Sequence, residues 1–312
     1  MKGTLGALRA EVETRDGVLH PRYDLELDGV AAALDPTAPT GVRLRYIGGA
    51  VCSACGTSLA PQRPRGSAYC FRCFRTLARN DLCVMAPHRC HLHAGTCREP
   101  EWADGFCMQP HTVYLALTSG LKVGVTRQVR AERRWLDQGA WLALPIAETP
   151  TRRAAGFVEH RLAERVPDRT DWRKLVGTEP GPQTLRDGQR VLVETAEDLR
   201  AWVGELVSLA PAWVPPEEAA AMAWLPATDT VAFAYPVQMR APPRRIRVSA
   251  ERPEFAGNLC GVLGRYLLFP QGVVYVDDHL QGDIEVTVGE ALTPNEQSPA
   301  ETGGQLSLFD QN

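Results

Sequence analysis

Four cysteines in two close pairs are the strongest constraint on how this chain of 312 residues can fold. Cys52 and Cys55 form one C-x2-C pair, Cys70 and Cys73 form another, and 14 residues separate the pairs. Each pair can close a turn that presents two thiolates to one tetrahedral zinc ion, and the loop between them brings the pairs together. We therefore predict a zinc site of ribbon or treble-clef type. Four protein ligands leave no open coordination position, so the site is expected to be structural.

A second cysteine-rich stretch follows at irregular spacing. Its cysteines are Cys83, Cys90, Cys97 and Cys107, and four histidines lie among or just after them. We predict a second zinc site held by these four cysteines, or by three of them with His91 or His93. A segment of this length has little apolar core, so bound metal is expected to supply much of its folding free energy.

Composition and charge narrow the class of protein. Hydrophobic residues make up 44% of the chain, charged residues 23%, and the net charge is −3, so the chain as a whole is not a basic nucleic-acid binder. The N-terminal stretch has no apolar run typical of a signal peptide, and "LCGVLGRYLLF" is too short to span a bilayer. We expect a cytoplasmic protein with reduced thiols, which favours metal ligation over disulfides. The ninth cysteine, Cys260, is expected in the core.

The order of strand-like and helix-like segments predicts an α+β fold. Its parts are a zinc-knuckle module, a small α/β core and a β-rich, barrel-like domain. The expected boundaries are strands in 1–50 that join the C-terminal β domain, the zinc module at 51–111, the core at 112–178, a helical connection at 179–229, the β domain at 230–290, and a disordered tail at 291–312.

Two of the predicted helices are amphipathic. The stretch "RRAAGFVEHRLAERV" has an apolar stripe formed by Ala155, Val158, Leu162 and Val166. A second helix is expected over 193–209, with its N-terminus near Thr195. The first of these helices follows three predicted strands, "TVYLALT", "LKVGVT" and "WLALPIAE".

The stretch "TVYLALTSGLKVGVTRQVRAERRW" resembles the start of a GIY-YIG endonuclease domain. Residues 112–114, ending in Tyr114, match the first family triplet, and residues 122–124, starting with Lys122, match the second. Arg134 matches the family's essential arginine, and Glu159 on the following helix matches its metal-binding glutamate. The resemblance implies catalytic roles for these four side chains and a Mg²⁺ or Mn²⁺ ion on Glu159.

The chemistry of phosphodiester hydrolysis explains these residue types. It needs a cation at the developing charge, an arginine that holds the phosphate, and a hydroxyl or water as nucleophile. Two positions depart from the family pattern, since Lys122 replaces a tyrosine and Gln138 stands where many members carry histidine. The structural alternatives are that Tyr114 is a strand residue of the core and that Arg134 and Glu159 only form an ion pair.

A second resemblance covers most of the chain. The cysteine block with "GTCREPEW", then "HTVYLA", "KVGVT" and "RWLDQGA", is similar to a family of uncharacterised bacterial proteins catalogued only as a domain of unknown function. This resemblance implies no particular activity.

Positive charge is concentrated in the centre of the chain. Between Lys122 and Lys174 there are twelve Lys and Arg residues against seven Asp and Glu residues. We predict a phosphate-facing surface there, and the alternative is a solvated helix face. The basic run "RAPPRRIRV" is expected to flank the same groove, and sparse aromatic residues argue against a platform for stacking single strands. The predicted nucleic-acid ligands are Lys122, Arg127, Arg130, Arg133 and Arg134.

The last ten residues, "GGQLSLFDQN", place large apolar side chains at the end of a polar tail. The segment "QLSLF" resembles the short motif with which bacterial DNA polymerases and repair proteins bind the sliding clamp. The resemblance implies binding through Gln305, Leu306, Ser307, Leu308 and Phe309. The alternative is a tail that folds back as an extra strand on the β domain.

Together these features predict a nucleoid-associated DNA replication or repair protein tethered to the clamp. Its expected activity is that of a magnesium-dependent, structure-specific endonuclease. The alternatives are a non-catalytic DNA-binding zinc adaptor and an RNA-binding zinc protein.

Overall fold

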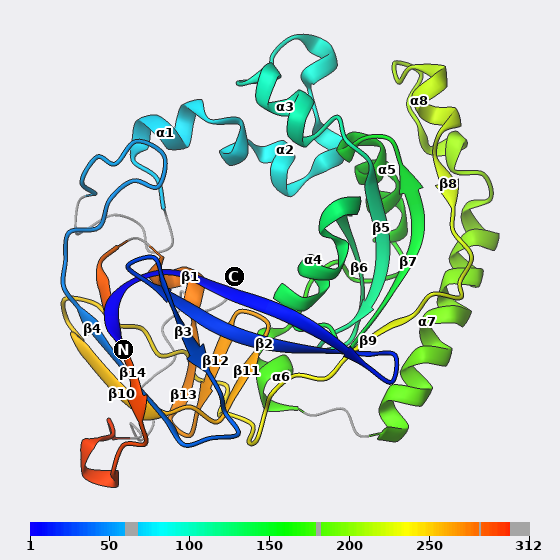
Figure 1. The fold of residues 1–312 in the computed structure, drawn as a ribbon. Helices are drawn as coiled ribbons and strands as arrows, with labels where there is room; N and C mark the ends of the chain where they lie inside the picture. Colours follow the sequence, from blue (N-terminus) through cyan, green and yellow to red (C-terminus); the bar gives the residue numbers. More distant parts are fainter. Residues whose placement is uncertain (60–67, 179–181, 281, 300–312) are drawn as a thin grey trace.

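The computed structural model describes residues 1–59, 68–178, 182–280 and 282–299 (Figure 1). The fold is mixed α/β, and its main feature is a large mixed sheet. The strand order along this sheet is β10-β4-β14-β1-β2-β9-β7-β5-β6, with β3 beside β2 and β8 beside β7.

Strands from both ends of the chain share this sheet. The N-terminal strands are β1 (Lys2–Arg15), β2 (Val18–Leu27), β3 (Val30–Leu34) and β4 (Thr40–Tyr46). The first two form a hairpin closed by Asp16 and Gly17, whose φ values of 48° and 76° suit a two-residue turn. β14 (Ile284–Glu290) pairs with β1 on one side and with β4 on the other, and β10 (Glu254–Asn258) pairs with β4.

The central strands are β5 (His111–Leu117), β6 (Leu121–Arg127) and β7 (Leu142–Thr149), with β5 antiparallel to both neighbours. Two short strands, β8 (Ala223–Trp224) and β9 (Val231–Phe233), pair with β7. β9 also pairs in parallel with β2, so it joins the central strands to the terminal ones.

The two faces of the central strands bury different partners. Val113 and Leu115 pack in one apolar cluster with α5 (Arg152–Leu162) and α7 (Pro182–Val203). Tyr114 and Ala116 alternate with them and pack on the other face with α4 (Ala131–Asp137) and the terminal strands. This alternation follows from the two-residue side-chain period of a strand. The predicted apolar stripe is buried at all four positions, but only Ala155, Val158 and Leu162 lie on α5, because the helix ends at Leu162 before Val166.

A small sheet packs into the second cluster. It contains β11 (Gly261–Leu263), β12 (Tyr266–Phe269) and β13 (Gly272–Tyr275), paired in that order. The strand order runs as open paths, so the described residues form no closed barrel, and the barrel-like domain predicted from the sequence is not observed. One reason is that "GVLGRYLLF" is a hairpin rather than one strand, because Gly264 at φ 59° reverses the chain. Cys260 is buried in this region, as predicted.

The cysteine-rich segment contains short helices along one side of the molecule, and its turn at Pro87–Arg89 packs against α5 (Figure 1). These helices are α1 (Phe71–Thr76), α2 (Leu82–Met85) and α3 (Pro100–Phe106). Gly156 of α5 allows the close approach, because a β-carbon there would lie 2.4 Å from the His88 backbone nitrogen. Arg152 strengthens the contact by donating through Nη2 to the Val84 carbonyl and through its backbone N–H to the Cys107 carbonyl.

Two predicted boundaries differ from the structure. α7 begins at Pro182, so Thr195 lies inside this helix and does not cap it. The reason is that Leu185 and Gly188 extend the packing surface, with Gly188 close to Leu117. The disordered tail does not begin at residue 291 either: Ser298 exchanges hydrogen bonds with the Ala256 backbone.

The remaining helices are α6 (Trp172–Gly177) and α8 (Pro216–Ala220). Within the described ranges, no helix has both the length and the apolar character needed to cross a membrane.

The glycine contact between α5 and the cysteine-rich segment gives a first prediction. Gly156→Ala should destabilise the protein by about 1–3 kcal/mol, because the added methyl group meets backbone atoms that must move. The measurement is the midpoint of urea unfolding of the purified protein. Gly105→Ala in α3 is the matched control, because nothing lies within 4 Å of a β-carbon there. Its helix should gain up to about 1 kcal/mol. Equal midpoints for the two variants would contradict the proposed contact.

Candidate functional site

The first cysteine group forms a compact four-sulfur cluster. Cys52 begins a turn closed by Gly56, whose N–H donates to the Cys52 carbonyl, while Cys70 caps the N-terminus of α1 and Cys73 lies in its first turn. All four sulfur atoms lie within 4.8 Å of one another, and the sulfurs of Cys55 and Cys70 are 3.7 Å apart. Tetrahedral zinc with bonds of about 2.3 Å would space its sulfurs by about 3.8 Å. The cluster could therefore hold zinc.

Crowding of the thiols supports this assignment. The neighbouring thiols of Cys55 and Cys70 raise the pKa of Cys73 to about 12. Four sulfurs this close together cannot all ionise unless a cation offsets their charge, and bound zinc supplies such a cation.

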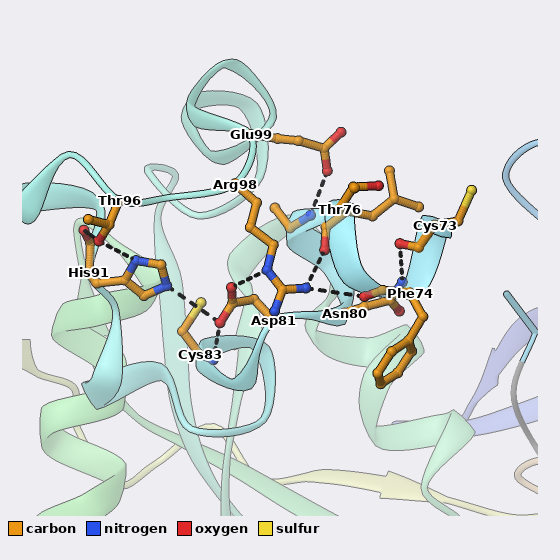
Figure 2. Close-up of polar contacts among 12 residues, drawn as sticks. Cys73, Phe74, Thr76, Asn80, Asp81, Cys83, His91, Thr96, Arg98 and Glu99 are labelled. Carbon is orange, nitrogen blue, oxygen red and sulfur yellow. Dashed lines mark hydrogen bonds and ion pairs between the residues drawn. The ribbon is translucent and has the colours of Figure 1, made fainter. Parts of the chain in front are cut away.

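The second cysteine group is arranged differently. Cys83, Cys90, Cys97 and Cys107 line one small pocket of about 20 Å³, together with Asp81 and His91. The ligand atoms that lie within 4.8 Å of one another are those of Asp81, Cys83 and His91. Figure 2 shows these three side chains converging, with Asp81 between His91 and Arg98.

Asp81 is already partnered in this pocket. Its carboxylate lies 2.7 Å from Arg98 Nε and 3.4 Å from His91 Nε2. Of the two histidines proposed as alternative ligands, His91 lines the pocket, whereas His93 stacks on Trp213 at a ring distance of 3.7 Å. The four cysteines therefore share one pocket, but their sulfurs are spread more widely than those of the first cluster.

A tyrosine, a glutamine and an arginine form a chain of contacts on the α4 face of the sheet. Tyr114 is directly opposite Gly124 in the strand pairing, and a β-carbon on Gly124 would lie 2.6 Å from the tyrosine Oη. The guanidinium of Arg134 can only donate, so the Gln138 amide oxygen faces it and accepts from Nε and Nη2 at 2.9 Å. The Gln138 amide nitrogen then lies 2.8 Å from Tyr114 Oη.

Charged side chains gather next to this chain of contacts. Lys122 lies on the same face as Tyr114 because its cross-strand partner is Ala116. Burial and the nearby Arg134 lower the pKa of Lys122 to about 8, although Glu159 and Asp168 act in the opposite direction. Burial raises the pKa of Glu159 to about 7, against the attraction of Arg152 and Lys122. The fold thus brings together charged and polar side chains that are up to more than fifty residues apart in the sequence.

The alternatives to a functional site were a core position for Tyr114 and an ion pair between Arg134 and Glu159. Tyr114 is completely buried, and burial raises its pKa to about 12, which fits a core position. Its hydroxyl nevertheless takes part in the polar chain to Arg134. In the part of the chain that the structure describes, Arg134 and Glu159 do not form the ion pair proposed as the other alternative.

A groove of about 1240 Å³ opens beside these residues. Lys122, Arg130 and Arg134 line it. Arg133 also lines it, but Arg133 is bound by Asp137 at 3.1 Å and donates to the Leu8 carbonyl at 3.0 Å.

The structure places the fifth predicted nucleic-acid ligand elsewhere. Arg127 is not among the residues that line the groove, and its guanidinium lies 4.4 Å from the centre of the Phe106 ring. Arg133 and Arg127 therefore mainly connect elements of the fold.

Sequence reasoning missed several residues of the site. Asp168 and Arg152 interact electrostatically with Glu159, and three aromatic residues, Trp172, Tyr266 and Tyr275, line the groove. No local motif marks them, because the aromatic residues come from segments about ninety residues apart in sequence. The tail motif Gln305, Leu306, Ser307, Leu308 and Phe309 lies outside the described residues.

Comparison with known proteins identified one family. Its sequence model, described as "Protein of unknown function (DUF2797)", matches residues 40–281, which include both cysteine groups and all the residues of the central site. Neither the curated proteins nor the solved structures gave a match.

Proposed function

Because the chain belongs to the DUF2797 family, whose function is unknown, we propose a function from the site itself. The protein is a zinc-containing, DNA-binding protein whose central strands and α5 form a metal-dependent phosphodiesterase site of GIY-YIG type. The observation that carries this proposal is the convergence of Lys122, Arg134 and Glu159 beside a groove lined by six Lys and Arg residues against four Asp and Glu residues.

The side chains present fit a hard divalent cation. Glu159 and Asp168 interact electrostatically and offer carboxylate oxygens, the ligands that Mg²⁺ and Mn²⁺ prefer. Such an ion, when bound, would stabilise negative charge developing on a phosphate and lower the pKa of bound water.

The chain's own residues would hold the phosphate. Arg134 is always charged and can donate two parallel hydrogen bonds to phosphate oxygens. Gln138 orients its guanidinium, and Tyr114 in turn orients Gln138. Lys122 adds a second cation on the same face of the sheet. The raised pKa of the Tyr114 hydroxyl suits a positioning role, because this group stays protonated near neutral pH.

One observation favours a second candidate, a non-catalytic DNA-binding adaptor. Tyr114 has no exposed surface, so its hydroxyl cannot reach a substrate without movement of α4. In this case the same cations would hold DNA without cutting it.

A DNA cleavage assay distinguishes the phosphodiesterase from the non-catalytic adaptor. Glu159→Gln should reduce magnesium-dependent cutting of nicked or branched DNA by about 100-fold or more, because a neutral amide is a poor ligand for the cation. DNA affinity should remain within about twofold, since Arg134 and Lys122 are unchanged. Glu132→Gln, an exposed change on α4, is the matched control and should cut normally. Equal cutting by Glu159→Gln would refute the mechanism, and wild-type binding without any cutting would support the adaptor.

Both cysteine groups are proposed as zinc sites. Purified protein should contain about two zinc ions per chain, measured by elemental analysis. Cys55→Ala and Cys97→Ala should each lose about one ion, because removing one thiolate opens a tetrahedral site. Cys260→Ala removes a core cysteine and should keep both ions. Unchanged zinc in Cys97→Ala would show that the second pocket is not a metal site.

We also propose that the C-terminal motif binds a sliding clamp. The full-length protein should bind the clamp of its own organism with a dissociation constant on the order of micromolar, because only two or three apolar side chains are available for burial. Truncation after Gly304, or Leu308→Ala with Phe309→Ala, should abolish binding, whereas Thr302→Ala should not. Equal binding by the full-length and truncated proteins would contradict the role of the motif. Surface plasmon resonance on immobilised clamp is a suitable measurement.

A further inference from the structure

We propose that the groove accepts an unpaired stretch of nucleic acid, whose bases stack on Trp172, Tyr266 and Tyr275. This inference rests on the proposed function for the phosphate contacts and specifies the form of substrate. It also reverses the expectation, drawn from sparse aromatic residues in the basic stretch, that no stacking platform exists.

The three rings form a row on the wall of the groove. The Trp172 and Tyr266 rings are nearly parallel, with an interplanar angle of 14° and centres 6.3 Å apart. Tyr275 continues the row, with its centre 4.9 Å from that of Tyr266. Trp172 and Tyr266 pack partly on the apolar core, and all three rings also line the groove. Trp172 and Tyr266 are therefore braced by the core, and all three rings face the groove.

The surrounding elements fix the orientation of these rings. Tyr266 and Tyr275 are directly opposite each other on β12 and β13, so the strand pairing sets their separation. Trp172 is the first residue of α6, which is capped by Asp171 through hydrogen bonds to the backbone N–H groups of residues 173 and 174. Rings held in this way lose little conformational freedom when a base stacks on them.

Guanidinium groups lie at both ends of the row. Arg173 is 4.9 Å from the centre of the Trp172 ring, and Arg245 is 4.7 Å from that of the Tyr275 ring. Arg245 is also paired with Asp278 at 3.0 Å. Aromatic side chains together with arginines are typical of proteins that bind single-stranded nucleic acid.

The aromatic row adjoins the proposed phosphate site. Gly264, two residues before Tyr266, abuts the end of α4, since a β-carbon there would lie 2.7 Å from the Asp137 carbonyl oxygen. On the other side, Leu175 of α6 packs against Gly139, just after α4. Bases on the rings and phosphates near Arg134 can thus belong to the same strand.

Only unpaired bases fit this arrangement. In a duplex the faces of the bases are covered by neighbouring base pairs, so aromatic side chains have nothing to stack on. A single strand, a flap or the arm of a branched molecule exposes those faces.

The test compares three oligonucleotides of equal length by fluorescence anisotropy with the full chain: oligothymidylate, an abasic oligonucleotide with the same phosphates, and a duplex. Oligothymidylate should bind about tenfold or more tightly than the abasic strand. Trp172→Ala should remove most of this difference, whereas Trp172→Phe should keep most of it. Trp213→Ala, an exposed tryptophan outside the groove lining, should behave as wild type.

The outcomes separate this inference from the proposed function. Salt-sensitive binding that is equal for the thymidylate and abasic strands would overturn the stacking role and leave the phosphate contacts supported. No binding of any of the three would refute the proposed function itself. The wild-type comparison needs no variant, so it remains decisive if Trp172→Ala fails to fold.

Discussion

The arrangement of the site depends on the contacts made by the C-terminal end of α4. This helix has seven residues, too few to be stable alone, so its neighbours hold it in place. Tyr235 donates to the Leu136 and Ala140 carbonyls, Arg133 reaches the backbone of β1, and Leu175 covers Gly139. Three distant regions of the chain therefore fix one short helix. Because this helix carries Arg134 and Gln138, the same contacts orient the groups that we propose to bind phosphate.

The cysteine-rich segment supports the other half of the site. It packs on α5 at Gly156, three residues before Glu159, and Arg152 is bound to its backbone. A segment of short helices with little core needs metal to keep its shape. The position of α5, and with it that of Glu159, therefore depends on the cysteine-rich segment, whose Cys107 carbonyl also accepts from the Arg152 backbone N–H.

The sequence was informative where local patterns set structure. Cysteine spacing predicted the four-sulfur cluster, helical periodicity predicted the buried stripe of α5, and strand alternation predicted the central hairpin with Tyr114. It was not informative where contacts between residues far apart in the sequence determine the structure. Gly264 divides an apolar run into two strands, and the aromatic row needs residues from α6, β12 and β13. It also suggested that Arg133 was free for DNA, because sequence cannot show that carbonyls of β1 and Asp137 bind it.

The two departures from the GIY-YIG pattern make physical sense together. Gln138 accepts from Arg134 through its amide oxygen and donates to Tyr114 through its amide nitrogen. A neutral histidine also carries one donor and one acceptor, but on ring nitrogens whose roles are fixed by its tautomer. Lys122 then brings a second cation close to Arg134. With Arg152, these cations exceed the two carboxylates of Glu159 and Asp168 by one charge, and partial protonation of Glu159 near neutral pH increases the excess. A partly buried site with one unmatched positive charge favours a monovalent anion, and a phosphodiester is such an anion. Both residues therefore suit the phosphate binding that we propose, whether or not the bond is cut.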